Sequence, residues 1–366
     1  MQTTPSRRAI GRAAGVERNH EQEETMTVTR RLVLGGLVAA PAVIGAGRLG
    51  HAATVLKISH QFPGGTIDSG DFRDRLCRKF AAEVEARTKG EISFQIYPNS
   101  SLMKTVAQFS ALRKGALDLS LYPLAYAGGE VQELNIGLMP CLTTSYEQGL
   151  AWRKAEIGAA LTDSLDKKGV KIITWIWQAG GVASRAGKVV NPGDVKGLKI
   201  RGGSREMDLM LKAAGGIISS VPSNEIYAAM QTGSLDAAVT SSTSLISFRL
   251  EEISKNLTTG RGKSFWYMLE PLLMSKSVYD GLSADARKAI SDVGESMQAF
   301  GLAEAKKDDE QIAGIYAKAG VGVADMDSAA IDKWRKIAEA EAWKDFADRN
   351  ADCARFLKLA QAVSAA

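Results

Sequence analysis

The chain has 366 residues, with 46 Lys and Arg, 41 Asp and Glu, and a formal net charge of +5. Seven Arg and four Glu lie in residues 1–53, a net of +3 of that +5, so the remaining 313 residues carry only +2. This remainder is long enough for two α/β lobes that share a cleft, and its charge excludes the clustered basic stripe of a nucleic-acid-binding protein.

Residue types that carry enzyme chemistry are scarce after residue 53. His60 is the only histidine there, and no HExxH or GxSxG motif occurs, so a histidine triad or a zinc hydrolase lacks its residues. The three cysteines, Cys77, Cys141 and Cys353, have no CxxC spacing and are interpreted as buried thiols or as one bridge. We therefore expect no catalytic residue, no metal and no cofactor.

The first 53 residues have the pattern of an export signal. Arg30 and Arg31 precede an uncharged run of 16 residues, 32–47, which is shorter than the ~20 residues of a membrane span. Small residues follow up to Ala53, where we expect cleavage and release into the periplasm. The twin arginine favours the Tat route, with an ordinary Sec signal as the alternative, and both Met1 and Met26 are possible starts.

From residue 54 the sequence alternates strand and helix patterns. Strands are expected over 55–59, 92–96 and 117–121, a helix over 71–87 and a second helix that runs through Leu112. In the first helix, Phe72, Leu76, Phe80 and Val84 recur every four residues on one stripe. The β-α-β-α-β order predicts a mainly parallel sheet covered by helices.

A short motif occurs twice, 118 residues apart. Residues 112–118 read LRKGALD and residues 230–236 read MQTGSLD, each with glycine at a helix C-cap position and Leu-Asp at a strand start. Strands at 196–201 and 235–240, a helix at 204–214 and a helix N-cap at Ser223 complete the second copy. The repeat predicts two lobes of similar plan.

The last eighty residues change character. Helices rich in Ala, Glu and Lys are expected over 283–318 and 328–349. They carry few polar side chains of the kind that form sites, so we interpret them as supports that brace the lobes.

Arg201 ends the predicted strand at 196–201, where loops gather around a ligand. A guanidinium is always charged and presents a planar fork of donors that matches a carboxylate. The alternative for any strand-end arginine is a surface ion pair of little energetic value.

A family resemblance favours the ligand role. Residues 194–201 read DVKGLKIR, which resembles the signature of the DctP-like periplasmic solute-binding proteins of TRAP transporters, and TKGEI at 88–92, YPNSSL at 97–102, LRKGALD and YAAMQTGSLD at 227–236 match in order. The resemblance implies an α/β fold of two lobes with a ligand cleft between them and long C-terminal helices. It implies lobe one at 54–178 plus about 267–306, and lobe two at 179–266 plus about 307–366.

The resemblance also implies site residues. Arg201 occupies the carboxylate-binding position, and Gln178 lies in the segment where many relatives carry another arginine. Arg185 either makes a second positive contact or faces solvent. The remaining candidates are hydroxyl residues after the second Leu-Asp, aromatic residues near the two crossovers between the lobes, and loop residues of lobe one, namely Thr240, Ser241 and Ser242, Trp177, Trp266 and Tyr267, and His60, Gln61 and Tyr122. We expect one or two of the three hydroxyl residues to face the ligand and the others to cap a helix. The alternative for the aromatic residues is packing in the core, and the alternative for His60 is a structural role.

The predicted function is a monomeric receptor that closes around a small organic anion and delivers it to TRAP permease subunits. Two alternatives stay open. One is an extracytoplasmic hydrolase that uses a Ser-Lys or a carboxylate scheme, and the other is a ligand-sensing partner of a signalling receptor.

Overall fold

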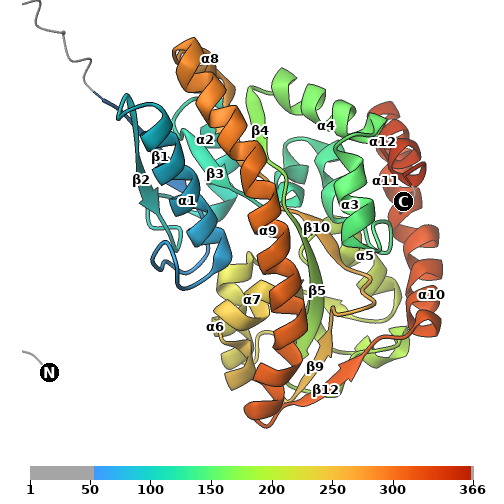
Figure 1. The fold of residues 1–366 in the computed structure, drawn as a ribbon. Coiled ribbons are helices and arrows are strands. Elements are labelled where there is room, and N and C mark those ends of the chain that lie inside the picture. The colour runs from blue at the N-terminus through green and yellow to red at the C-terminus, as the bar shows by residue number, and fades with distance from the viewer. Residues whose placement is uncertain (1–52, 364–366) are drawn as a thin grey trace, which may run out of the picture. The chain divides into compact units, whose positions relative to one another are not determined.

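The computed structural model describes residues 53–363. The predicted export signal, apart from Ala53, and the choice between Met1 and Met26 lie outside the described residues. Figure 1 shows two sheets with helices on their faces, joined by strands and by one long helix.

Lobe one is the part built on a five-stranded sheet of order β2-β1-β3-β11-β4. Its strands are β1 (Thr54–Ser59), β2 (Ile92–Tyr97), β3 (Leu119–Leu121), β4 (Val170–Thr174) and β11 (Leu272–Ser275). Strand β1 runs parallel to β2 and β3, as the β-α-β-α-β pattern predicted, whereas β11 is antiparallel to β3 and β4.

The helices of lobe one are α1 (Phe72–Arg87), α2 (Gln108–Arg113), α3 (Tyr146–Trp152) and α4 (Glu156–Lys167). The predicted stripe of α1 is confirmed, because Phe72, Leu76, Phe80 and Val84 are all buried. Asp71 caps the helix by accepting a hydrogen bond from the backbone N–H of Arg73.

Lobe two is built on a sheet of order β12-β9-β5-β8-β6-β7, with β10 paired to the first residues of β5. Its strands are β5 (Trp177–Ser184), β6 (Lys199–Arg201), β7 (Ile217–Ile218), β8 (Ala237–Ser241), β9 (Asn256–Thr259), β10 (Tyr267–Leu269) and β12 (Gly322–Asp325). Its helices are α5 (Arg205–Ala213), α6 (Ile226–Gln231) and α7 (Ser242–Ser247).

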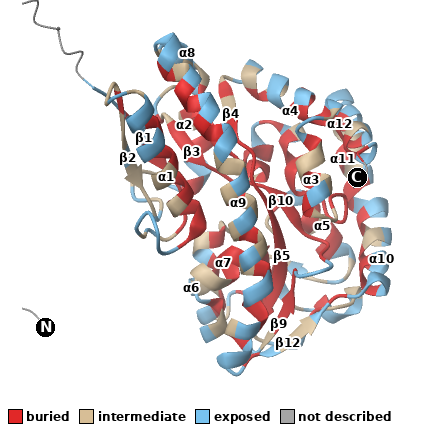
Figure 2. Cartoon of the chain, viewed as in Figure 1, coloured by how far each residue is buried: buried red, intermediate tan, exposed pale blue. Residues whose placement is uncertain are grey.

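The chain crosses between the lobes several times. Strand β4 leads into β5, and β10 returns to β11, so both sheets share these two connections. Figure 2 shows that β5 and β10 are buried along their length. Because β10 pairs with β5, the two connections run side by side between the sheets.

Helix α9 (Ala284–Lys318) follows the short α8 (Lys276–Asp280) and confirms the predicted long helix. Ser283 caps it, its first half packs on α1 and β4, and its second half packs on α7 and β9. Figure 1 shows it crossing in front of both sheets, in orange. The rest of the C-terminal region consists of α10 (Ser328–Ile337), a π-helical stretch (Ala338–Trp343), α11 (Lys344–Arg349) and α12 (Ala351–Gln361).

The repeated motif has the same geometry in both lobes. Gly115 and Gly233 end their helices with φ of +69° and +77°, a conformation in which glycine avoids the steric cost of a Cβ. Asp118 accepts a hydrogen bond from the N–H of Lys57 in β1 at 2.7 Å, and Asp236 accepts one from Lys199 in β6 at 2.8 Å. Asp118 precedes β3 and holds its neighbour β1, and Asp236 precedes β8 and holds its neighbour β6.

One detail of the sequence prediction was wrong. Ser223 does not cap a helix, because it is the first residue of a 3-10 turn (Ser223–Glu225) whose N-cap is Pro222. The helical stretch expected over 328–349 is confirmed at both ends, and its middle is the π-helical stretch, which packs on α5. Packing of neighbouring elements decides both features, and local sequence pattern does not record it.

Cys77, Cys141 and Cys353 are free and buried, which confirms the first of the two interpretations. Burial raises the pKa of the Cys141 thiol to about 12. Within residues 53–363, no helix combines the length and apolar character needed to cross a membrane.

Candidate functional site

Arg201 lies at the end of β6 and is 2 % exposed, so it is not the surface ion pair of the alternative interpretation. Its Nε donates to the carbonyl of Val221 at 3.0 Å, Nη1 to the carbonyl of Val239 at 2.8 Å, and Nη2 to the hydroxyl of Tyr126 at 2.6 Å. A guanidinium has five N–H groups. One on Nη1 and one on Nη2 therefore have no hydrogen-bond partner within residues 53–363.

Tyr126 connects the arginine to lobe one. It belongs to a 3-10 segment (Leu124–Gly129) after β3, and its hydroxyl also accepts from the N–H of Ser223 at 3.1 Å. Its ring meets that of Tyr122 edge to face at 6.0 Å. The sequence analysis missed Tyr126, and the only available signal was its place four residues after Tyr122.

A cavity of about 500 Å³ opens beside this contact between the lobes. Lobe one contributes Val106, Ala125 and Tyr126, and lobe two contributes the loop after β6, one side of α5 and the segment after β7, namely Gly203, Ser204, Arg205, Asp208, Leu209, Lys212, Ile218, Ser220, Val221 and Pro222. This volume falls in the ordinary range of small-molecule sites.

Gly203 lines this cavity and lies against the guanidinium of Arg201, which is itself not among the lining residues. The φ of Gly203 is +99°, and a Cβ at this position would lie 2.6 Å from Nη1. Glycine is thus required both by the backbone conformation and by the close approach of the guanidinium.

Asp208 is the acidic group on the cavity wall. Burial raises its pKa, although hydrogen bonds from the Ser220 hydroxyl at 2.6 Å and the Gly202 N–H at 3.0 Å and the charge of Arg201 oppose the shift. Its two oxygens are therefore engaged in holding the loop after β6 in place.

Trp266 is the predicted aromatic residue that lies nearest to the arginine loop. Its Nε1 donates to the carbonyl of Gly202 at 3.3 Å. A Cβ on Gly180 would lie 2.3 Å from the indole ring, so the ring occupies the space of a side chain at that position.

The strand pairing divides the other polar candidates between two faces. Arg201 pairs with Ala238, and Thr240 lies two residues further along β8, so Arg201 and Thr240 share a face. Ser241 pairs with Gly180 and shares the opposite face with Gln178. The hydroxyl run therefore does not form one site.

Ser241 and Gln178 instead join a buried charged cluster. Ser241 caps α7 by accepting from the N–H of Ser244 at 3.1 Å, and it also accepts from Arg73 at 3.4 Å. Gln178 donates to Glu270, a residue between β10 and β11. Arg73 and Glu270 are fully buried and were missed, because their sequence neighbourhood has no site motif.

The loop residues of lobe one have different roles. The ring of His60 donates from Nε2 to Asp74 at 3.1 Å and accepts from the N–H of Phe62 at 3.3 Å, as assigned from these contacts, so neither nitrogen is available to a ligand. Gln61 accepts from the Thr105 hydroxyl at 3.5 Å. The Nε2 of Gln61 and the hydroxyl of Tyr122 are buried without a partner within residues 53–363.

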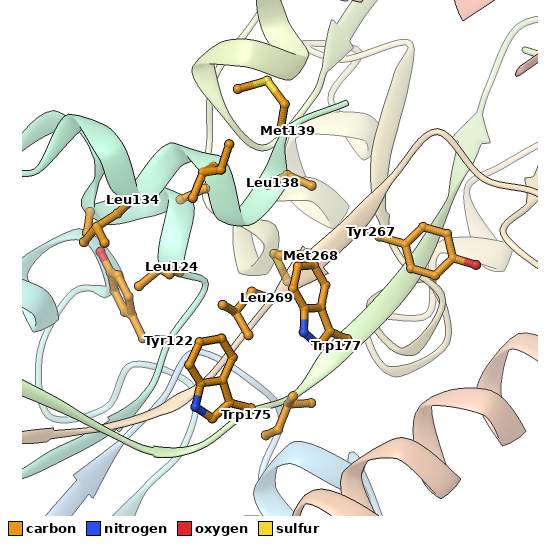
Figure 3. Close-up of a cluster of buried hydrophobic side chains, with 14 of the residues drawn as sticks. Tyr122, Leu124, Leu134, Leu138, Met139, Trp175, Trp177, Tyr267, Met268 and Leu269 are labelled. Carbon is orange, nitrogen blue, oxygen red and sulfur yellow. The ribbon is translucent and has the colours of Figure 1, made fainter. Parts of the chain in front are cut away.

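Three other candidates lie away from the Arg201 cavity. Trp177 packs edge to face on Trp152 with ring centroids 5.0 Å apart, inside the hydrophobic cluster of Figure 3. Tyr267 points away from that cluster in Figure 3 and packs edge to face on Tyr146 at 5.5 Å. The Ser242 hydroxyl is buried without a partner in the described part of the chain.

Arg185 is half-buried at the end of β5, beside Gly233 and the start of β8. Arg201 lies at the other end of the parallel strands β6 and β8. The geometry therefore does not bring the two arginines together as a clamp.

No cluster of three or more His, Cys, Asp or Glu side chains arranged to hold a metal ion occurs in the described residues. The site consists instead of one buried guanidinium with unused donors, the aromatic side chains of Tyr126 and Trp266 beside it, and a cavity at the junction of two lobes whose wall also carries charged side chains. Such an arrangement is suited to non-covalent binding of a small anion.

Comparison with known proteins places the chain clearly. Residues 70–350 match the DctP family, described as bacterial extracellular solute-binding protein, family 7. A solute-binding protein of Albidiferax ferrireducens is 60 % identical over 329 residues, covering 90 % of this chain and 96 % of that protein. The C4-dicarboxylate-binding periplasmic protein DctP of Rhodobacter capsulatus is 28 % identical, covering 72 % and 78 %.

A solved structure is similar over the whole described body. It is a TRAP periplasmic solute-binding protein of Rhodoferax ferrireducens with bound malonate, 62 % identical, with a TM-score of 0.83 and coverage of 84 % of this chain and 97 % of that one. The likeness confirms the two-lobe α/β fold with long C-terminal helices.

Proposed function

Because the chain belongs to the DctP family of bacterial extracellular solute-binding proteins, we propose that it captures a small organic acid in the periplasm and delivers it to a TRAP-type membrane permease. Members of this family are binding proteins and not enzymes. Malonate in the 62 % identical structure supports a small carboxylate as the ligand class.

Arg201 is the proposed carboxylate anchor. The observation that carries this assignment is its buried guanidinium, which keeps two unused N–H groups beside the cavity between the lobes. Thr240, on the same face, is the nearest hydroxyl candidate, and Trp266 is the aromatic candidate. Tyr126 is added because it contacts Arg201 from lobe one.

The proposed mechanism is closure of the lobes around the acid. Lobe two supplies the arginine, lobe one supplies Tyr126, and a ligand that touches both stabilises the closed state by its difference in affinity for the two states. We propose lobe boundaries at 54–178 with about 267–306 and at 179–266 with about 307–366. The sheets support the boundaries near 178 and 267 to within a few residues, whereas the last helix, α12, packs on α4 of lobe one.

The anchor is tested by calorimetric titration with malonate, preceded by a thermal-shift screen of organic acids, in which a ligand at 100 times its Kd adds ~2.7 kcal/mol of stability. Arg201→Lys keeps the charge but loses the planar fork, so we expect binding weakened by at least about tenfold, ~1.4 kcal/mol. Arg185→Lys is the matched control and leaves the affinity unchanged. Equal affinity in wild type and Arg201→Lys would refute the anchor.

The location is tested on protein recovered from the periplasm. Intact mass is expected to correspond to a chain that begins near Ala53 or Thr54. A full-length chain retained in the cytoplasm would contradict both export and delivery to a permease. Scattering of the same sample also tests the proposed monomeric state.

A further inference from the structure

A buried charged cluster joins the two lobes away from the Arg201 cavity. Arg73 lies in the first turn of α1, has no exposed surface, and places its guanidinium carbon 3.6 Å from the centroid of the Phe62 ring. Its Nε and Nη2 donate to the two oxygens of Asp71 at 2.9 and 2.7 Å. This two-pronged ion pair holds the guanidinium in one orientation within lobe one.

The other contacts of Arg73 are made outside lobe one's own helices. Nη1 donates to the hydroxyl of Ser244 at 3.0 Å and, at 3.4 Å, to Ser241, while Nη2 reaches Ser247 at 3.4 Å. These serines recur every three residues on one side of α7 and its cap. Nη1 also lies 3.4 Å from Glu270, on the connection between β10 and β11.

Nη1 and Nη2 of Arg73 each contact two or more acceptors, whereas Nη1 and Nη2 of Arg201 each have a single one. Three serines of lobe two are aligned on a charge that lobe one supplies and orients. A hinge movement that separates α1 from α7 has to break these bonds, and closure has to form them.

We propose that Arg73, Asp71, Glu270, Ser241, Ser244 and Ser247 form a clasp that positions the lobes in the closed arrangement independently of ligand. Arg73 is a positioning residue in this scheme and does not contact the ligand. The proposal deepens the proposed function, since closure is the step that captures the acid, but the clasp itself requires no acid to form.

The charge balance of the clasp makes closure depend on pH. Burial raises the pKa of Glu270 to about 7, although the charge of Arg73 opposes the shift and that of Asp71 adds to it. The other titratable groups near this charged cluster are Cys77, Asp74 and Arg78 on α1 and Asp308 on α9.

The direction of the pH dependence follows from the pKa of Glu270 in the open and in the closed arrangement of the lobes. When the lobes open, water reaches Glu270 and its pKa returns toward the ordinary 4.5. The closed state therefore binds the proton more tightly, and its advantage is complete below about pH 4.5 and declines as the pH rises to about 7. Above that pH both states are ionised and the dependence ends.

The test measures the distance between spin labels at Lys104→Cys and Ala213→Cys, exposed positions on the two sides of the cleft. The native cysteines are buried and remain unlabelled. Without ligand, the wild type is expected to populate the short, closed distance, and Arg73→Gln to reduce that population by about threefold or more. Arg78→Gln, on the same helix but paired with Asp74 inside lobe one, is the matched control and leaves the distribution unchanged.

A second variant protects the test against misfolding. Ser244→Ala with Ser247→Ala keeps the buried charges and removes only contacts to α7, so it is expected to shift the distribution in the same direction by less. Unchanged distributions in both variants, or a wild type that is fully open without ligand, would overturn the clasp. Failure of malonate to bind would contradict the proposed function but would leave this ligand-free comparison intact.

Two further readouts separate positioning from ligand contact. The closed population of the wild type is expected to fall between pH 5 and pH 7.5, and Glu270→Gln is expected to flatten that change. Asp309 on α9 is a second buried carboxyl, and burial raises its pKa to about 6. Asp309→Asn is therefore the control, and it is expected to leave the contribution of Glu270 in place. If Arg73→Gln altered the preference among malonate, succinate and acetate, and not only the common affinity, Arg73 would be a ligand contact and the clasp would be rejected.

Discussion

The two lobes use the same local motif but carry different chemistry at the cleft. In each, a glycine with positive φ ends a helix, an Asp follows it, and the Asp carboxylate accepts from a backbone N–H of the neighbouring strand. Beyond this shared motif, lobe one contributes Tyr126 to the wall of the cavity, and lobe two contributes Arg201, which donates to the Tyr126 hydroxyl.

The difference indicates how the work of binding is divided. In the proposed function, lobe two supplies a charge with unused donors for the acid, whereas lobe one supplies the neutral hydroxyl of Tyr126, which contacts Arg201 where the lobes meet. The repeated motif sets the position of the strands, and the residue that follows each strand sets the chemistry.

The largest expected effect comes from removing the charge of lobe two. Arg201→Ala is expected to weaken malonate binding about 100-fold, ~2.7 kcal/mol, because the buried carboxylate loses its fork of donors. Tyr122→Phe, the counterpart in lobe one, is expected to change the affinity by less than about threefold. Calorimetric titration of both variants checks the division of labour, which equal losses would contradict.

The two glycines give the next largest effect. Alanine in a left-handed conformation costs about 1–2 kcal/mol, so Gly115→Ala and Gly233→Ala both lower the free energy of unfolding. A Cβ on Gly115 would lie 3.0 Å from the Ser277 hydroxyl, and one on Gly233 would lie 3.3 Å from the flexible end of Arg185. Urea unfolding is therefore expected to show the larger loss for Gly115→Ala, and the reverse order would mean that the two turns are not equivalent.

The paired aspartates test the repeat more closely. Asp118→Ala and Asp236→Ala each remove one exposed hydrogen bond to a strand N–H, so each is expected to cost about 1 kcal/mol of unfolding free energy. Equal shifts of the denaturation midpoint in the two variants would support the same structural role for the motif in both lobes. A loss confined to one lobe would show that the motif is only a sequence coincidence in the other.

A further modest effect is expected at the contact between the lobes. Tyr126→Phe removes the hydroxyl that accepts from Arg201 and from the N–H of Ser223. These donors become accessible to water when the lobes open, so the affinity is expected to fall by only about threefold to fivefold, mainly through faster dissociation of malonate in stopped-flow traces. An unchanged dissociation rate would place the hydroxyl outside the closing contact.

Local pattern was enough for the elements that depend on neighbours in the sequence. The stripe of α1, the glycine ends of two helices and the long α9 were all predictable, because helix termination and burial of one helix face act over a few residues. The Ser223 cap failed because the segment around it is held by Tyr126, a contact that spans 97 residues.

The sequence by itself determined two α/β lobes, the bracing helix and an arginine at the end of a strand as the candidate anchor. The tertiary structure alone decided which polar side chains meet. In the tertiary structure, Thr240 and Ser241 lie on opposite faces of β8, and both ring nitrogens of His60 form hydrogen bonds within the protein. Arg73 of α1 contacts Ser244 of α7, which is 171 residues away in the sequence. The physical reason is that strand pairing and lobe contact set these distances, and both depend on the packing of segments that are far apart in the chain.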